Sequence, residues 1–169
     1  MATAQDNLLD WLRDAHAMEQ QAEKMLSSQA ERLEHYPDLR IRIEQHLEET
    51  HQQRALLESC LQRLGSSPST IKDISAKLMA FGQAVSGMAM SDEVVKGAMS
   101  GYVFENMEIA SYTVLIEAAK AAGDIETQRA CETILPQEIA MSDWLREHLP
   151  ELTRAFLARS AAPDTEAKR

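Results

Sequence analysis

The chain has little of several residue types on which other classes of protein depend. It carries two cysteines, six glycines and five prolines in 169 residues. These counts exclude a disulfide-stapled scaffold and a collagen-like or linker-rich chain. Aromatic residues make up only 5 %, and no apolar run approaches the roughly eighteen residues that a membrane span needs. The first residues also lack the apolar stretch of a signal peptide, so we expect a cytoplasmic protein with reduced cysteines.

Positive charge is scarce as well. Seventeen Lys and Arg stand against 27 Asp and Glu, which gives a net charge of −10. Nucleic-acid binders and proteins that bind anionic membranes need basic surfaces, so neither nucleic acid nor a membrane is an expected partner. Hydrophobic residues make up 44 %, an ordinary share for a globular protein, and the length corresponds to one domain.

Helix-forming residues dominate the chain and repeat with helical periodicity in four long segments, at residues 5–34, 38–64, 91–123 and 124–158. Pro136 and Pro150 predict kinks or breaks in the last segment. The short connections predict two antiparallel hairpins, joined by a long crossover that carries one or two short helices within 70–90. The sequence thus predicts an all-α, four-helix-bundle domain at 1–159, followed by a disordered tail at 160–169.

Carboxylates interrupt the apolar stripes of three of these helices. Glu19 lies in the stripe Leu8, Leu12, Ala15, Ala22, Leu26, and the other acids in such stripes are Glu105, Glu108 and Glu138. Reflection across each hairpin turn places the acids at one height in the bundle. One acid in an apolar stripe is usually a boundary residue, but several buried together would repel each other at a cost of several kcal/mol each. Two divalent cations would neutralise them, so the pattern indicates a two-metal site.

The segment 38–64 is less clear. Glu48 and His51 are three residues apart and share a face with Ile41 and Ala55. Larger apolar residues lie on an adjoining face, at Ile43, Leu47, Leu57 and Leu61. The choice of Glu48 and His51 therefore depends on the other three helices.

Longer stretches resemble a known family. Glu on the first helix, Glu-x-x-His on the second, Glu-x-x-Glu on the third and Glu on the fourth resemble the rubrerythrin-like di-iron carboxylate bundles among ferritin-like proteins. The segments 12–20, 46–50, 105–112 and 132–138 resemble the YciE/YciF family of ferritin-like proteins. Carried over by motif, the metal ligands would be Glu19, Glu48, His51, Glu105, Glu108 and Glu138.

This resemblance implies a homodimer with two metal ions, iron first and manganese or zinc as alternatives, that reacts with dioxygen or hydrogen peroxide in a stress response. One position departs from the pattern. Met141 stands where the fourth helix of ferritin-like proteins often has a histidine, and a thioether is a poor ligand for a hard ferric ion. The alternative function is therefore a non-catalytic dimeric bundle for protein interactions, with a static, degenerate or empty metal site. The sequence decides neither between these two functions nor which metal is native.

Overall fold

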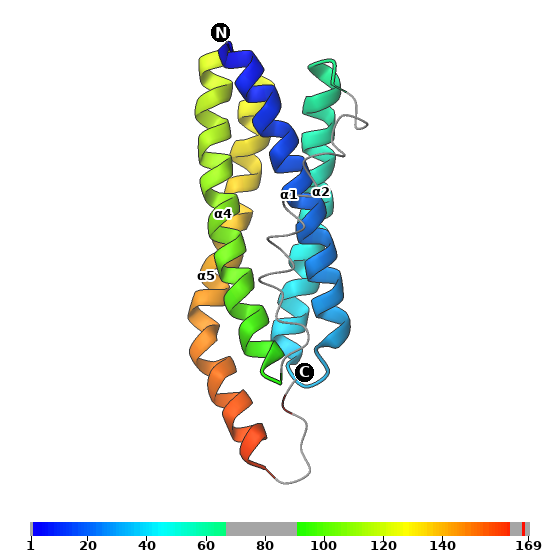
Figure 1. The fold of residues 1–169 in the computed structure, drawn as a ribbon, viewed down its shortest axis with the longest axis vertical. Helices are drawn as coiled ribbons and strands as arrows, with labels where there is room; N and C mark the ends of the chain where they lie inside the picture. Colours follow the sequence, from blue (N-terminus) through cyan, green and yellow to red (C-terminus); the bar gives the residue numbers. More distant parts are fainter. Residues whose placement is uncertain (1, 67–90, 163–166, 168–169) are drawn as a thin grey trace.

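The computed structural model describes residues 2–66, 91–162 and 167, which form four α-helices and no strand. The helices are α1 (Ala4–Arg32), α2 (Pro37–Arg63), α4 (Glu93–Ala122) and α5 (Ile125–Ala161), and they lie along one another in an elongated bundle (Figure 1). The predicted all-α fold and four-helix bundle are confirmed. The short helices predicted within 70–90 fall outside the described residues.

Local sequence explains where most helices begin and end. Thr3 caps α1 by accepting a hydrogen bond from the Asp6 backbone N–H, and the Asp6 carboxylate accepts one from the Thr3 backbone N–H. Pro37 occupies the first turn of α2, where its missing N–H costs nothing. Gly123 ends α4 with a φ of 70°, which favours glycine, and Asp124 then caps α5. These signals place the helix ends close to the predicted residues.

The last helix differs from its prediction in two respects. α5 runs unbroken through Pro136 and Pro150. Both prolines are exposed, so water can satisfy the carbonyl that loses its helical partner at each of them. The helix also continues to Ala161, into the segment predicted to be disordered, and Ala167 is buried with its carbonyl accepting a hydrogen bond from the Tyr36 hydroxyl.

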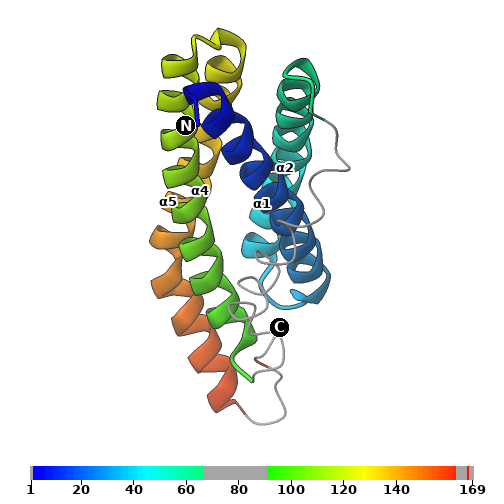
Figure 2. The ribbon, with the colours of Figure 1, turned by 45° about the horizontal axis from the view of Figure 1, so that its top comes forward.

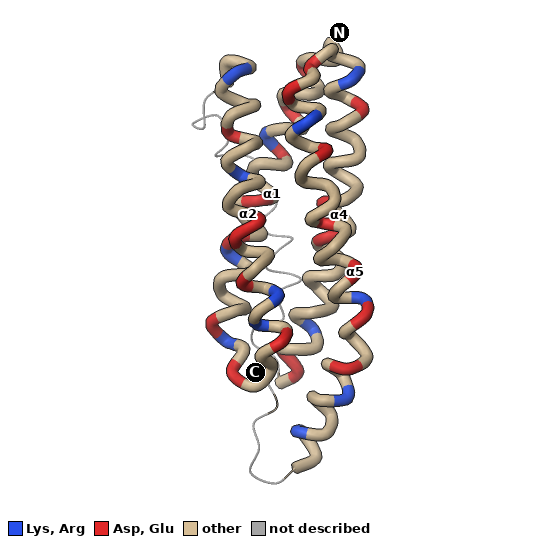
Figure 3. The backbone as a smooth tube through the Cα atoms, turned by 180° about the vertical axis from the view of Figure 1, so that it is seen from behind, with Lys and Arg blue, Asp and Glu red and all other residues tan. Residues whose placement is uncertain are grey.

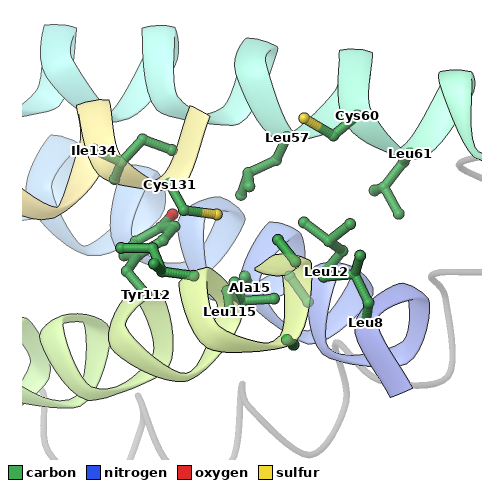
Figure 4. Close-up of a cluster of buried hydrophobic side chains, with 14 residues drawn as sticks. Leu8, Leu12, Ala15, Leu57, Cys60, Leu61, Tyr112, Leu115, Cys131 and Ile134 are labelled. Carbon is green, nitrogen blue, oxygen red and sulfur yellow. The ribbon is translucent and has the colours of Figure 1, made fainter. Parts of the chain in front are cut away.

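Two hydrophobic clusters fill the space between the hairpins α1–α2 and α4–α5, which lie side by side in both ribbon views (Figures 1 and 2). The first cluster includes Leu12, Leu57, Leu115 and Ile134, one from each helix (Figure 4). The second includes Leu26, Ile43, Phe104 and Leu145. Along α2, α4 and α5 the buried residues that lie between the members of the two clusters are polar. The fold therefore encloses a polar layer between two apolar ones.

Candidate metal centre

A histidine and three glutamates meet in that polar layer. The group consists of His46 on α2, Glu105 and Glu108 on α4, and Glu138 on α5, all of them buried. Each of the four residues offers one ligand atom, and these four atoms all lie within 4.8 Å of one another. His46 Nε2 is 3.1 Å from Glu105 Oε2 and 3.4 Å from Glu138 Oε2. The geometry therefore offers one nitrogen and several carboxylate oxygens to a single small volume.

Helical spacing explains why these side chains converge. Glu105 and Glu108 are three residues apart, so both lie on the inward face of α4. The tight turn at Gly123 makes α5 antiparallel to α4 and brings Glu138 to the height of this pair. Asp and Glu residues accordingly occur at mid-height on both hairpins (Figure 3).

The first helix adds a fourth carboxylate. Glu19 is buried, and the Tyr112 hydroxyl of α4 donates a hydrogen bond to its Oε1. Burial raises the pKa of Glu19 well above its ordinary value, and the charges of Glu138 and Glu105 add to this effect while the Tyr112 hydrogen bond opposes it. Glu19 therefore belongs to the same electrostatic group as the three glutamates of α4 and α5.

Burial also raises the pKa values of Glu108 and Glu105. Burial, followed by the charges of Glu138 and Glu19, raises the pKa of Glu108 well above its ordinary value. Burial also raises the pKa of Glu105, to about 7, against the opposing effect of His46. These carboxyls therefore hold their protons to a much higher pH than exposed glutamates do.

His46 supplies positive charge to the group. Burial lowers its pKa, but Glu105, Glu138 and Glu49 favour the charged imidazole more strongly, so that the pKa is raised well above its ordinary value. Among the described residues no lysine or arginine is buried. One imidazolium thus faces four carboxyl groups, and no buried lysine or arginine of the described residues would balance the charge that these groups carry once they lose their protons.

Several oxygens of the group also lack hydrogen bonds. Glu19 Oε2, Glu108 Oε1 and Glu138 Oε1 are buried and have no partner among the described residues. Unsatisfied buried polar atoms are costly, and native structures rarely hold several of them in one place. Carboxylate and imidazole donors are ligands that iron, manganese and zinc accept. The residues present therefore fit a metal ion by charge, by donor type and by their unused oxygens.

The structure brings four of the six residues named from the sequence into this group: Glu19, Glu105, Glu108 and Glu138. It does not bring Glu48 and His51 there, because their side chains are 68 % and 42 % exposed. His51 instead lies on the surface, with Nε2 3.5 Å from Glu23 Oε1 and Nδ1 3.7 Å from Glu48 Oε2. The predicted inward face of this helix is wrong, since Ile41 and Ala55 are exposed too.

His46 is the residue that the sequence analysis missed. It lies five residues before His51, which is about 140° around an α-helix, so the two histidines cannot face the same way. The signal was present in the buried stripe of α2, whose members are spaced alternately by four and three residues: Leu39, Ile43, His46, Thr50, Gln53, Leu57 and Cys60. Three polar residues stand in the middle of this stripe, so hydrophobicity alone does not show that it is the buried face.

The fold and this group define the class of protein: a four-helix bundle with a buried histidine–carboxylate group that could hold a metal ion. Residues 3–158 match the family described as Domain of unknown function (DUF892), and the chain belongs to this family. A crystal structure of a protein from Xanthomonas campestris is similar at 44 % identity, with a TM-score of 0.80, over 95 % of this chain and 100 % of that one. The structure of YcfI from Rhodopseudomonas palustris is similar at 29 % identity, with a TM-score of 0.67, over 86 % of this chain and 94 % of that one.

No helix in the described part of the chain has the length and the apolar character needed to cross a membrane.

Proposed function

We propose that this protein is a ferritin-like metal protein that binds one or two metal ions in the buried polar layer. The proposed ligands are Glu19, His46, Glu105, Glu108 and Glu138. The observation that supports the proposal most strongly is the set of buried, unpartnered carboxylate oxygens around a single histidine. Two divalent cations would offset about four negative charges and supply the missing partners.

Iron is the metal we propose first, with manganese and zinc as alternatives. The ligand set contains only carboxylates and one imidazole, which suit these metals better than soft ones. The two cysteines do not compete for the metal, because Cys60 and Cys131 are free thiols within the first hydrophobic cluster. Burial raises the pKa of the Cys131 thiol to about 12, so it stays protonated at neutral pH.

We propose dioxygen or hydrogen peroxide as the substrate and a stress response as the setting, in line with the resemblance to the YciE/YciF family. Bound iron would supply one-electron oxidation and reduction between its ferrous and ferric states. The chain would orient Glu19 through Tyr112 and exclude bulk water with the apolar clusters on both sides. The competing proposal is a static metal site in a non-catalytic bundle, and Met141 favours it, because this buried thioether stands one turn after Glu138.

Metal binding should raise the melting temperature. A metal that binds only the folded state stabilises it by about 2.7 kcal/mol at a hundredfold excess over its dissociation constant. For a chain of this length we expect an increase of roughly 5–10 °C. Calorimetry measures this increase on protein that is first stripped with a chelator and then loaded with one metal, either Mn²⁺, Zn²⁺ or, in the absence of oxygen, Fe²⁺. An unchanged melting temperature with all three metals would overturn the proposal.

A homodimer is a further proposal, and the outer face of α4 is the surface we assign to it. Between Lys96 and Glu117 the only charged residues are the buried Glu105 and Glu108. Met99, Val103 and Val114 are exposed on this face. Two copies of a chain with a net charge of −10 repel each other at charged surfaces, so an uncharged apolar face favours a second copy as its partner.

Val103→Lys should therefore convert a dimer into a monomer, because it would bury a lysine without a partner in the contact. Ile41→Lys is the matched control, since Ile41 is equally exposed but lies on α2. Sedimentation equilibrium of the three proteins measures the mass. We expect a dimer for the parent and for Ile41→Lys, and a monomer for Val103→Lys. A parent monomer, or a Val103→Lys dimer, would contradict the proposal.

A further inference from the structure

His46 makes contacts on both sides of its ring. Nε2 faces the buried carboxylates of Glu105 and Glu138, at 3.1 and 3.4 Å. Nδ1 lies 2.7 Å from Oε2 of Glu49, one turn later on α2. His46 is 1 % exposed, whereas the Glu49 side chain is 33 % exposed. The imidazole thus stands between the buried group and a carboxylate at the protein surface.

Glu49 is itself held in place from the same helix. Arg42, one turn before His46, donates a hydrogen bond from a guanidinium nitrogen to Glu49 Oε2 at 3.4 Å. The Arg42 side chain is only 12 % exposed, so it lies packed along the bundle. The hydrogen bond with His46 and the charge of Arg42 together outweigh burial and lower the pKa of Glu49. Glu49 is therefore a fixed carboxylate that accepts hydrogen bonds.

An imidazole can bind a metal through either nitrogen, and the hydrogen bond at one nitrogen decides which one is free. A carboxylate at Nδ1 keeps a proton there and leaves the lone pair of Nε2 for the metal. It also stops rotation about the side-chain bonds, because turning the ring would break a short contact. The contact between His46 and Glu49 has the geometry for both effects.

We propose that Glu49, held by Arg42, is a positioning residue that presents Nε2 of His46 to the metal centre. Glu49 does not bind the metal itself, and it acts only through His46. The inference rests on the proposed function, since it assumes that the buried group holds a metal. It goes further by assigning a role to two residues outside the group.

The chain offers a matched control in a second histidine with the same kind of partner. His16 is 1 % exposed, and its Nε2 lies 3.0 Å from Oε1 of the half-buried Glu58. This pair lies outside the group of His46, Glu105, Glu108 and Glu138. Glu58→Gln thus removes a carboxylate from a buried histidine, as Glu49→Gln does, without touching His46.

The test compares the parent, Glu49→Gln and Glu58→Gln by Zn²⁺ affinity and by NMR of the zinc-loaded proteins. We expect a 10–100-fold loss of affinity for Glu49→Gln, the size usual for partners of metal-bound histidines, and parent-like binding for Glu58→Gln. The proton on Nδ1 of His46 should give a slowly exchanging signal in the parent and in Glu58→Gln. That signal should broaden or vanish in Glu49→Gln, which a purely structural role for Glu49 would not cause.

Other outcomes separate this inference from the proposed function. Equal affinity and an unchanged Nδ1 proton in Glu49→Gln would overturn the role of Glu49 and leave the metal site standing. Equal losses in Glu49→Gln and Glu58→Gln would also overturn it, because the effect would then be general. Failure of the parent itself to bind Zn²⁺, Mn²⁺ or Fe²⁺ would overturn both proposals.

Discussion

Without metal, Glu108→Gln should melt at a higher temperature than the parent. A metal that raises the melting temperature of the parent should leave that of Glu108→Gln unchanged. Glu108 is buried, its Oε1 has no partner among the described residues, and its pKa is raised well above the ordinary value. Burial therefore favours the protonated, neutral form of this carboxyl in the metal-free protein, and keeping a buried acid there lowers the free energy of unfolding at neutral pH.

Glutamine has the same shape and needs no proton, so we expect metal-free Glu108→Gln to be more stable by about 1–3 kcal/mol. The same substitution removes a proposed ligand, so the increase in melting temperature on loading with Mn²⁺ or Fe²⁺ should disappear. Glu105 would give a less clear result, because its removal would also take from His46 Nε2 the carboxylate that lies 3.1 Å away.

Glu117→Gln is the control on the same helix. Glu117 is exposed and forms an ion pair with Lys120, at 2.7 Å, so its loss should cost less than about 1 kcal/mol and leave the response to metal intact. Thermal unfolding of the three proteins, with chelator and with metal, measures both effects. A metal-induced increase in Glu108→Gln equal to that of the parent would remove Glu108 from the proposed ligands.

Metal should reverse the dependence of stability on pH. In the metal-free protein the pKa of Glu105 is about 7, against 4.5 for an unperturbed glutamate. Below pH 4.5 both the folded and the unfolded chain are protonated at this residue. Between pH 4.5 and 7 Glu105 loses its proton in the unfolded chain but keeps it in the folded one. The unfolded state is therefore stabilised relative to the folded state, and the free energy of unfolding falls.

The loss from Glu105 alone is on the order of 3 kcal/mol by about pH 7. Glu19 and Glu108 act in the same direction, because burial raises their pKa values too. His46 has the same sign, since a raised histidine pKa contributes stability that disappears as the pH rises through it.

With metal bound, the free energy of unfolding should rise with pH instead of falling. The carboxylates must lose their protons to bind the ion, so the stabilisation by metal grows with pH and acid displaces the ion. Urea unfolding at pH 5, 6, 7 and 8, with a chelator and with Mn²⁺, should give curves that fall with pH in the first series and rise in the second. Parallel curves would contradict a buried carboxylate site that binds metal.

The sequence was sufficient for the helices and for most of the polar layer, for a physical reason. Glu19 and Glu138 each interrupt a regular stripe of apolar residues, and that contrast is visible without a structure. Helix ends were predictable from Pro37 and Gly123, because each has a local conformational cause.

The face of α2 could not be chosen in the same way. Its buried stripe contains His46, Thr50 and Gln53 in succession, so polarity no longer separates inside from outside. Only the packing of α2 against α1 and α5 decides which histidine points inward. The continuation of α5 through its prolines has a similar explanation, because it depends on the exposure of Pro136 and Pro150.

The most direct test of the metal centre is anomalous X-ray diffraction from crystals loaded with Mn²⁺ or Fe²⁺, collected at the absorption edge of the metal. We expect one or two anomalous peaks within bonding distance of His46 Nε2 and the carboxylates of Glu105, Glu108 and Glu138, with Glu19 beside them. Peaks only at surface residues such as His51 and Glu23, or none inside the bundle after loading, would contradict it.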